Sequence, residues 1–596
     1  MIQNVSFWRK ILYLCGIALL WYPLYMIGRP AVGDPGKTAD ARPGGVLAQL
    51  RRENDLSQAE LGEIDPASES MRLATLGMRG VAANILWTKA NEYKRTENWE
   101  ALVATVNQMA KLQPNFVSVW EFQSHNLSYN VSVEQDDYRF RYQWVKKGID
   151  FLVQGTRYNR REPKLFWTVG WYTGQKFGRA DEHKQFRRLF REDREFHDFM
   201  SQYVDVDGEG QGPNGLPDNW LVSRLWFLRA YDLVDRQGAN LRGKAPHIFF
   251  ADGPKARMNQ ADAIESEGYH DEQAEIAWRR AGEEWHDYGN RLVSTSWGVN
   301  IRLNEEESLW AEGSRLQKEL DALAPGIREQ LRNQKVEKLT PDQRTALNLP
   351  KTDIKDEKTY RDRLEAETKV VVTDREVAEK APAATRAKAF QIASQVKENL
   401  DNAERVNRYR GNVNFNYWRT RCDVEQKPET VTGRRHIYQA KQLQADGQLE
   451  KSLKEYNEAW DIWARILDQN PGLMESLMAE DLYEDVQGYV KLLGQLEQKL
   501  PDDFKLMKLL KLNEQKMQDL PPAPVQPPSP EAKPAEAKPA EAKPAEAKPA
   551  EAKPAEANPA EAKPAEAKPA EAKPAEAKPA EAKPAEAKPA EAAAKP

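Results

Sequence analysis

The sequence predicts an all-α protein with an N-terminal transmembrane helix, a body of irregular helical repeats, and a disordered C-terminal tail. The repeats are expected to form either an α-solenoid or a helical bundle. Three observations lead to this fold class. Residues 11–27 carry no charge. Between about residues 70 and 510, apolar side chains recur at helical spacing, and the alternation typical of strands is scarce. Residues 530–596 repeat the pentapeptide Pro-Ala-Glu-Ala-Lys.

The composition is that of a folded body and excludes several classes of function. The 596-residue chain contains 17 Trp, 20 Tyr and 17 Phe, all before residue 520, which is ample material for a core. With 30% charged residues and a net charge of -5, the overall balance does not indicate nucleic acid as a partner. The two cysteines, Cys15 and Cys422, supply neither a disulfide framework nor a Cys-rich zinc or iron–sulfur site.

The charge-free run Ile11–Ile27 is predicted to contact the membrane, so residues 1–30 are assigned as an anchor. Seventeen helical residues rise about 25 Å, near the lower limit for a span. Arg9 and Lys10 precede the run, which predicts a cytoplasmic N-terminus and an extracytoplasmic body. Rings of the kind found at bilayer surfaces lie near both ends of the run, namely Trp8, Trp21, Tyr22 and Tyr25.

A cleaved signal peptide is the alternative interpretation of this N-terminal segment. The small residues Ala31-Val32-Gly33 would then form the cleavage site, but Pro23 and bulky rings precede them. Residues 31–69 are assigned as a flexible or mixed linker, because Gly28–Gly45 is rich in Gly, Pro and Ala.

Residues Ala83–Pro114 predict two helices joined by a short turn. Ala90 and Tyr93 share one face of the first helix, and Thr96-Glu97-Asn98 form the turn. The second helix opens at Trp99 and ends before Pro114, with apolar residues at helical spacing, namely Leu102, Val106, Met109 and Leu112. This 34-residue pattern resembles the tetratricopeptide repeat (TPR), although Leu102 and Met109 stand where that family usually has alanine.

Weaker versions of the same pattern recur along the body. They are Ala274, Trp278 and Ala281 after Gly268; Gly447 through Ala459 before Pro471; and Trp144 through Pro163 into Trp167 and Trp171. An ordinary helical bundle has the same spacing and remains the alternative. The expected domains are a TPR-like region over 70–300, a charged helical region over 301–405 with helix-forming runs such as Tyr360–Glu379, a second TPR-like region over 406–515, and a disordered tail over 516–596.

Several stretches resemble an uncharacterised bacterial family, known mainly from planctomycete-type genomes. They include Gln113–Val117, Asn126–Ser132, Tyr158-Asn159, Gly170-Trp171, Phe186–Arg191 and Ser296–Gly298. Members look like single-span proteins with helical repeats, and some carry the label "IRE (iron responsive element)". The resemblance implies a bacterial, single-pass membrane protein and supplies no active site.

No residue is assigned a catalytic, cofactor-binding or metal-binding role. His183, Asp193, Glu195, His197 and Asp198 could bind zinc or iron, but interleaved Arg and Lys favour an ion-paired helix. His270 and His286 lie about 24 Å apart along a helix, too far for one ion, so a solvated face is expected. The glycines Gly208, Gly210, Gly212 and Gly215 predict a surface loop and not a phosphate cradle.

For two further sets of residues, the sequence is compatible with either a binding role or a structural role. Asn126, Tyr129 and Asn130 either line a groove that reads a peptide through its backbone, or they cap helices or bond buried backbone. The second set consists of aromatic and cationic residues, namely Trp220, Arg224, Trp226 and Arg229. These residues either form a binding surface or pack in the core.

The expected function is a membrane-anchored, non-catalytic scaffold that binds an unknown protein or peptide partner, without cofactor and without nucleic acid. The alternatives are an envelope enzyme acting on wall polymer or glycan, and a purely structural envelope component. In the tail, proline at every fifth position prevents a helix, and no side chain larger than alanine is available for burial. A spacer or wall-contacting role for the tail is one hypothesis, and a repeat expansion without a role is the other.

Overall fold

The computed structural model describes residues 79–519 apart from 242, 297, 351–353 and 355, together with 44–53 and scattered positions between 13 and 29. Most of the predicted tail lies outside the described residues, as do much of the predicted anchor and linker. The predicted start of the tail at residue 516 is wrong, because residues 516–519 are the end of a helix. None of the helices in the described part has the length and apolar character needed to cross a bilayer. A short helix, α2 (Val46–Glu53), precedes the body.

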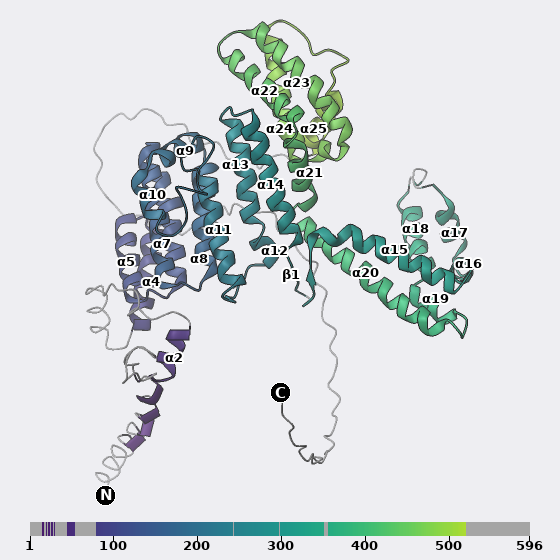
Figure 1. Cartoon of the computed structure of the whole chain (residues 1–596), viewed down its shortest axis with the longest axis horizontal. Coiled ribbons are helices and arrows are strands. Elements are labelled where there is room, and N and C mark those ends of the chain that lie inside the picture. Colours follow the sequence, from purple (N-terminus) through teal and green to yellow (C-terminus); the bar gives the residue numbers. More distant parts are fainter. Residues whose placement is uncertain are drawn as a thin grey trace, which may run out of the picture. The chain divides into compact units, whose positions relative to one another are not determined.

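The prediction of an all-α fold is confirmed for the described residues, because 77% of them are helical and strands are almost absent among them (Figure 1). The strands that the structure describes are two residues long, β1 (Val293–Ser294) and β2 (Asn300–Ile301). They pair antiparallel, with Val293 opposite Ile301.

The first part of the body is a series of packed helices. In chain order these are α4 (Arg79–Arg95), α5 (Trp99–Leu112), α6 (Val117–His125), α7 (Tyr138–Tyr158), α8 (Pro163–Gly178), α9 (His183–Glu192), α10 (Arg194–Met200), α11 (Asn219–Asp235), α12 (Pro246–Phe249), α13 (Asp252–Ser266) and α14 (Glu272–Asn290). Between α6 and α7, the chain continues as a π-helix, η2 (Asn126–Val131), and a 3-10 turn, η3 (Ser132–Glu134).

The predicted helix–turn–helix at residues 83–114 is confirmed by α4 and α5. Glu97 adopts a left-handed backbone conformation in the turn, with φ of 55°. The side chain of Asn98 accepts a hydrogen bond from the backbone N–H of Ala101 at 3.2 Å, which caps α5. Ala90 is fully buried, as are three of the predicted apolar positions on α5, namely Leu102, Val106 and Met109.

In the described residues of the charged middle region there are six helices. They are α15 (Glu306–Leu323), which follows the 3-10 turn η4 (Leu303–Glu305), then α16 (Ile327–Glu337), α17 (Pro341–Asn348), α18 (Glu357–Val370), α19 (Asp374–Lys380) and α20 (Arg386–Asn412). Helices α15 and α20 run side by side and share a core of their own (Figure 1). The expected run Tyr360–Glu379 is broken at Val371, because Thr373 and Glu376 form a reciprocal capping box that starts a new helix.

The last part of the body is a second helical region. Its elements are α21 (Phe415–Glu425), α22 (Pro428–Ala445), α23 (Leu449–Gln469), the 3-10 turn η6 (Pro471–Glu475), α24 (Leu477–Gln495) and α25 (Met507–Asp519). Helices α22 and α23 form a hairpin whose turn contains Gly447, with φ of 75°. Ser452 donates a hydrogen bond across this hairpin to the carbonyl of Ala440 at 2.8 Å.

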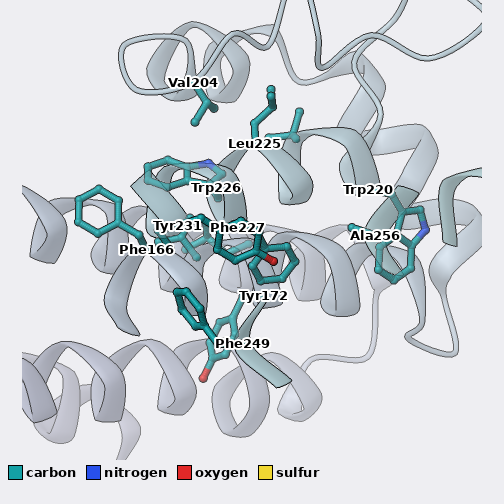
Figure 2. Packing of buried hydrophobic residues seen from close by; sticks show 14 of the residues in the cluster. Phe166, Tyr172, Val204, Trp220, Leu225, Trp226, Phe227, Tyr231, Phe249 and Ala256 are labelled. Carbon is teal, nitrogen blue, oxygen red and sulfur yellow. The ribbon is translucent and has the colours of Figure 1, made fainter. Parts of the chain in front are cut away.

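Buried rings dominate the largest core, which extends from Ala90 on α4 to Cys422 on α21. Figure 2 shows Trp226, Phe227 and Tyr231 of α11 packed within it. Trp226 lies 6.1 Å from Phe166 of α8, and Tyr231 lies 5.2 Å from Phe249 of α12, measured between ring centroids. A second core, from Val424 to Leu510, belongs to the last helices. The expected domain boundaries at residues 300 and 405 remain predictions.

Candidate functional site

An open groove with two adjoining compartments lies between helices that are far apart in the sequence. The first compartment has a volume of about 790 Å³ and is bordered by residues of α9, α13 and α22. The second has a volume of about 540 Å³ and is bordered by residues of α13, α22 and α24. Both compartments include five of the same residues, namely Lys184, Asp262, Ser266, Tyr438 and Gln442, so they form one continuous groove.

The first of these, the basic compartment, is defined by Arg179, Lys184, Arg187, Arg188 and Arg191. Helix α9 buries Phe186 and Phe190 in the core, which leaves its cationic side chains on the other faces. Arg187 is buried and donates to Asp218 at 2.9 Å and to Glu267 at 2.7 Å. Arg191 donates to the second oxygen of Glu267 at 2.6 Å.

Arg187 and Arg191 therefore serve mainly to hold α9 in place. The exposed cations Lys184 and Arg188 are left to meet a ligand, since the ion pair of Arg188 with Glu192 is a solvated one at 3.5 Å.

The second, the acidic compartment, is defined by Asp262, Glu265, Asp481, Glu484 and Asp485. Asp481, Glu484 and Asp485 are three and four positions apart on α24, so they share one face of that helix. Asp262 and Glu265 are likewise three apart on α13. The sequence interpretation missed these five carboxyls, although the spacing within each helix was visible.

Ion pairs neutralise part of this acidic set. Arg421 binds Asp262 at 2.7 Å, and Lys441 binds Asp485. Arg434 binds the fully buried Glu425 beneath the compartment at 2.6 Å. Within the described part of the chain, Asp481 and Glu484 form no ion pair, and Oε1 of Glu265 has no hydrogen-bond partner.

Burial and the neighbouring charge of Glu425 raise the pKa of Glu265 well above its ordinary value. Asp481 is exposed at the surface, but partial desolvation by the surrounding side chains also raises its pKa. Both carboxyls therefore hold a proton more strongly than a solvated acid does.

His270 lies in the wall of the acidic compartment, with 8% of its surface exposed. Burial, assisted by the charges of Arg434 and Arg435, lowers its pKa to about 4, so the imidazole is neutral near pH 7. Neither ring nitrogen has a hydrogen-bond partner among the described residues. The ring of Tyr438 on α22 lies 5.1 Å away.

The prediction of a solvated face for both His270 and His286 is wrong for His270. Gly268 turns the chain with φ of 98°, and a Cβ placed there would lie 2.8 Å from the Tyr438 hydroxyl. This close approach brings His270 against α22 before α14 begins. His286 is exposed, as expected.

The predicted polar cluster between residues 183 and 198 is split by the boundary between α9 and α10. His183 borders the basic compartment, whereas Asp193 caps α10 and accepts hydrogen bonds from Tyr142 and Lys146, both at 3.1 Å. His197 is buried edge-on against Phe190, so the expected ion-paired face does not include it.

Exposed members of this cluster do form ion pairs, as in Arg194–Asp198 at 3.2 Å. No group of three His, Cys, Asp or Glu side chains in the described residues is placed to hold a metal ion.

The segment with Asn126, Tyr129 and Asn130 lies in the π-helix η2. Asn130 donates to the side-chain oxygen of Asn126 at 3.1 Å. The Tyr129 ring stacks on His125, and Nζ of Lys176 lies 3.6 Å from its centroid. Asn126 is buried, whereas Tyr129 and Asn130 are partly exposed. Because π-helical turns are frequent at functional sites, this segment is a second candidate site. A groove that reads a peptide backbone here remains a prediction.

The remaining candidates have structural partners. Trp220 is buried beneath Arg179 and borders the basic compartment, whereas Trp226 lies in the core. Arg224 donates to Glu284 at 2.9 Å, and Arg229 donates to the backbone carbonyl of Tyr203. The glycine-rich stretch from Gly208 to Gly215 is a largely exposed loop, as predicted.

The fold and the site together define a helical protein with an open groove that is lined by both positively and negatively charged side chains. No family model matches the chain, and none of the curated proteins matches it.

Proposed function

We propose that this chain is a membrane-anchored, non-catalytic scaffold that holds an extended segment of a protein partner outside the cytoplasm. The observation that carries the proposal is the two-compartment groove. It is open and lined by charges of both signs, and some of its polar groups lack partners among the described residues. A chain segment with charged side chains and a free backbone complements such a surface.

We infer further that the body consists of irregular TPR-like repeats. Support comes from the helical hairpins α4–α5, α13–α14 and α22–α23, each of which coincides with a stretch of the repeat pattern. Small buried residues allow the helices of these units to approach, namely Ala90, Ala274, Ala281 and Ala459. Stacked helical hairpins commonly bind extended partners along one surface.

Site-directed photo-crosslinking in membranes tests the binding function. A photoreactive phenylalanine analogue at Gln442, an exposed position bordering both compartments, is expected to give one crosslinked partner in stoichiometric yield. The matched control places the same analogue at the exposed Gln330 of α16, outside the groove. Equal capture at both positions, or none at Gln442, would contradict the proposal.

An envelope enzyme acting on wall polymer or glycan is the second candidate, because one compartment contains both Glu265 and Asp481 with raised pKa values. Glu265 would be the acid. Incubation of the purified full-length protein with cell-wall polymer tests this enzymatic function. Soluble products that disappear in Glu265→Gln would establish the enzyme, and their absence from the wild type would exclude it.

A further inference from the structure

The acidic compartment keeps more negative than positive charge after its internal ion pairs are formed. Asp262, Asp485 and Glu425 each have a cationic partner. Asp481 and Glu484 remain without an ion pair, and Lys184 at the border is the lining cation for which the described residues provide none. Glu265 is not counted, because its raised pKa favours the uncharged, protonated form. The surplus selects for a positively charged ligand.

The deep wall of this compartment contains acceptor atoms without donors. Oε1 of Glu265 is buried, with 6% of the residue exposed, and the neutral His270, which lines the same compartment, has an unprotonated ring nitrogen. A buried polar atom without a partner destabilises the fold. Rotation of these side chains toward the groove would let the N–H donors of a ligand satisfy these atoms.

The lining also suits the stem of a long side chain. Tyr438 presents a half-buried ring at the border between the compartments, close to His270. Aromatic faces attract cations, and they also cover methylene groups. Lysine and arginine combine a methylene stem with three or five N–H donors at the tip.

We propose that the acidic compartment receives one lysine or arginine side chain of the bound segment. This inference rests on the proposed binding function. The neighbouring basic compartment, through Lys184 and Arg188, then receives an acidic residue of the same segment, so the partner carries both charges in a set order. A metal ion does not fit, because the described residues supply no three suitable ligands.

Selection from a random dodecapeptide library on the detergent-solubilised full-length protein tests this assignment. The enriched peptides are expected to share a lysine or arginine at one position and an acidic residue on one side of it. An enriched peptide is then titrated by fluorescence anisotropy. Asp481→Asn/Glu484→Gln is expected to weaken binding roughly fivefold, the effect of removing two partly screened charges.

Three controls make the result specific. Glu398→Gln/Asp401→Asn removes one glutamate and one aspartate charge from α20 instead, and it is expected to leave the affinity for the peptide unchanged. Replacing the basic residue of the peptide by norleucine should weaken binding, with no further loss in Asp481→Asn/Glu484→Gln. Glu265→Gln tests the contribution of the buried Glu265 carboxyl. If this buried substitution prevents folding, the double variant of the exposed residues Asp481 and Glu484 still tests the proposal.

The outcomes separate the two proposals. Enriched peptides without a basic residue, or equal affinity in Asp481→Asn/Glu484→Gln and the wild type, would overturn the lysine or arginine assignment while leaving the binding function standing. Failure to enrich any peptide would count against the binding function itself, and the assignment would fall with it.

Discussion

Single glycines on α7 determine how closely this helix approaches its neighbours. A Cβ on Gly148 would lie 2.1 Å from Oγ of Ser128 and 2.8 Å from the carbonyl oxygen of Ser124. A Cβ on Gly155 would lie 2.7 Å from the Trp120 ring. Gly148 and Gly155 are two turns apart on the same face, so the contact of α7 with α6 and the π-helix η2 depends on the absence of side chains there.

The substitution Gly148→Ala is expected to destabilise the body by about 1–3 kcal/mol, because a backbone carbonyl cannot move away from the new methyl group. Thermal unfolding followed by circular dichroism measures the effect. Gly411→Ala is the matched control, since a Cβ on this α20 glycine meets nothing within 4 Å. The control should be neutral or stabilising by up to about 1 kcal/mol. Equal midpoints for the two variants would contradict the close contact.

Asp150 on α7 links the stability of the body to pH. Burial, followed by the charges of Asp193 and Glu195, raises its pKa to about 7, against the opposing effect of Lys146. The folded chain therefore keeps a proton that the unfolded chain releases, so this group destabilises the fold as pH rises from about 4 to about 7. One carboxyl oxygen has no hydrogen-bond partner among the described residues.

Asp150→Asn removes this titration and should raise the midpoint of thermal unfolding by a few degrees above pH 7. Wild type and variant should converge as pH falls below about 4, where the carboxyl is increasingly protonated in the unfolded chain as well as in the fold. Circular dichroism at a series of pH values makes the comparison. A pH-independent difference between the two proteins would show that the substitution acts through packing alone.

At the scale of elements, the turn between α4 and α5 combines a favourable cap with an unfavourable conformation. Asn98 caps α5, but Glu97 adopts a left-handed conformation that glycine tolerates better. Glu97→Gly is therefore expected to stabilise the hairpin by up to about 1 kcal/mol, and Asn98→Ala to destabilise it by about 1 kcal/mol. Thermal midpoints of the two variants should shift in opposite directions. A loss of stability in Glu97→Gly would contradict the assigned backbone conformation.

Some helix boundaries could be predicted from local chemistry and others could not. The end of α5 was visible because Pro114 cannot continue a helix. The break between α18 and α19 was missed although two local signals were present, namely the β-branched run Val370–Val372 and the capping residues Thr373 and Glu376. The π-helix at Asn126–Val131 carries no local signal of that kind, since its wider turn depends on packing against α7.

At the scale of the whole molecule, membrane attachment is a prediction from the N-terminal sequence. The full chain should sediment with membranes and resist an alkaline wash, because Ile11–Ile27 is apolar and follows Arg9 and Lys10. Removing residues 1–30 should release the body into the soluble fraction. Immunoblotting of the fractions checks both statements, and a full chain recovered in the wash would contradict the anchor. An unshortened chain found in membranes would also exclude cleavage after Gly33.

The sequence by itself determined the helical class of the described body and the hairpin at residues 83–114. Both follow from the spacing of apolar side chains such as Leu102, Val106 and Met109, which is a local property of each segment. Only the tertiary structure decided the groove, because its walls combine α9, α13, α22 and α24 from distant parts of the chain. Which carboxyls are paired there and which remain open depends on those long-range contacts. The same contacts buried His270, whose local sequence is that of a solvated residue.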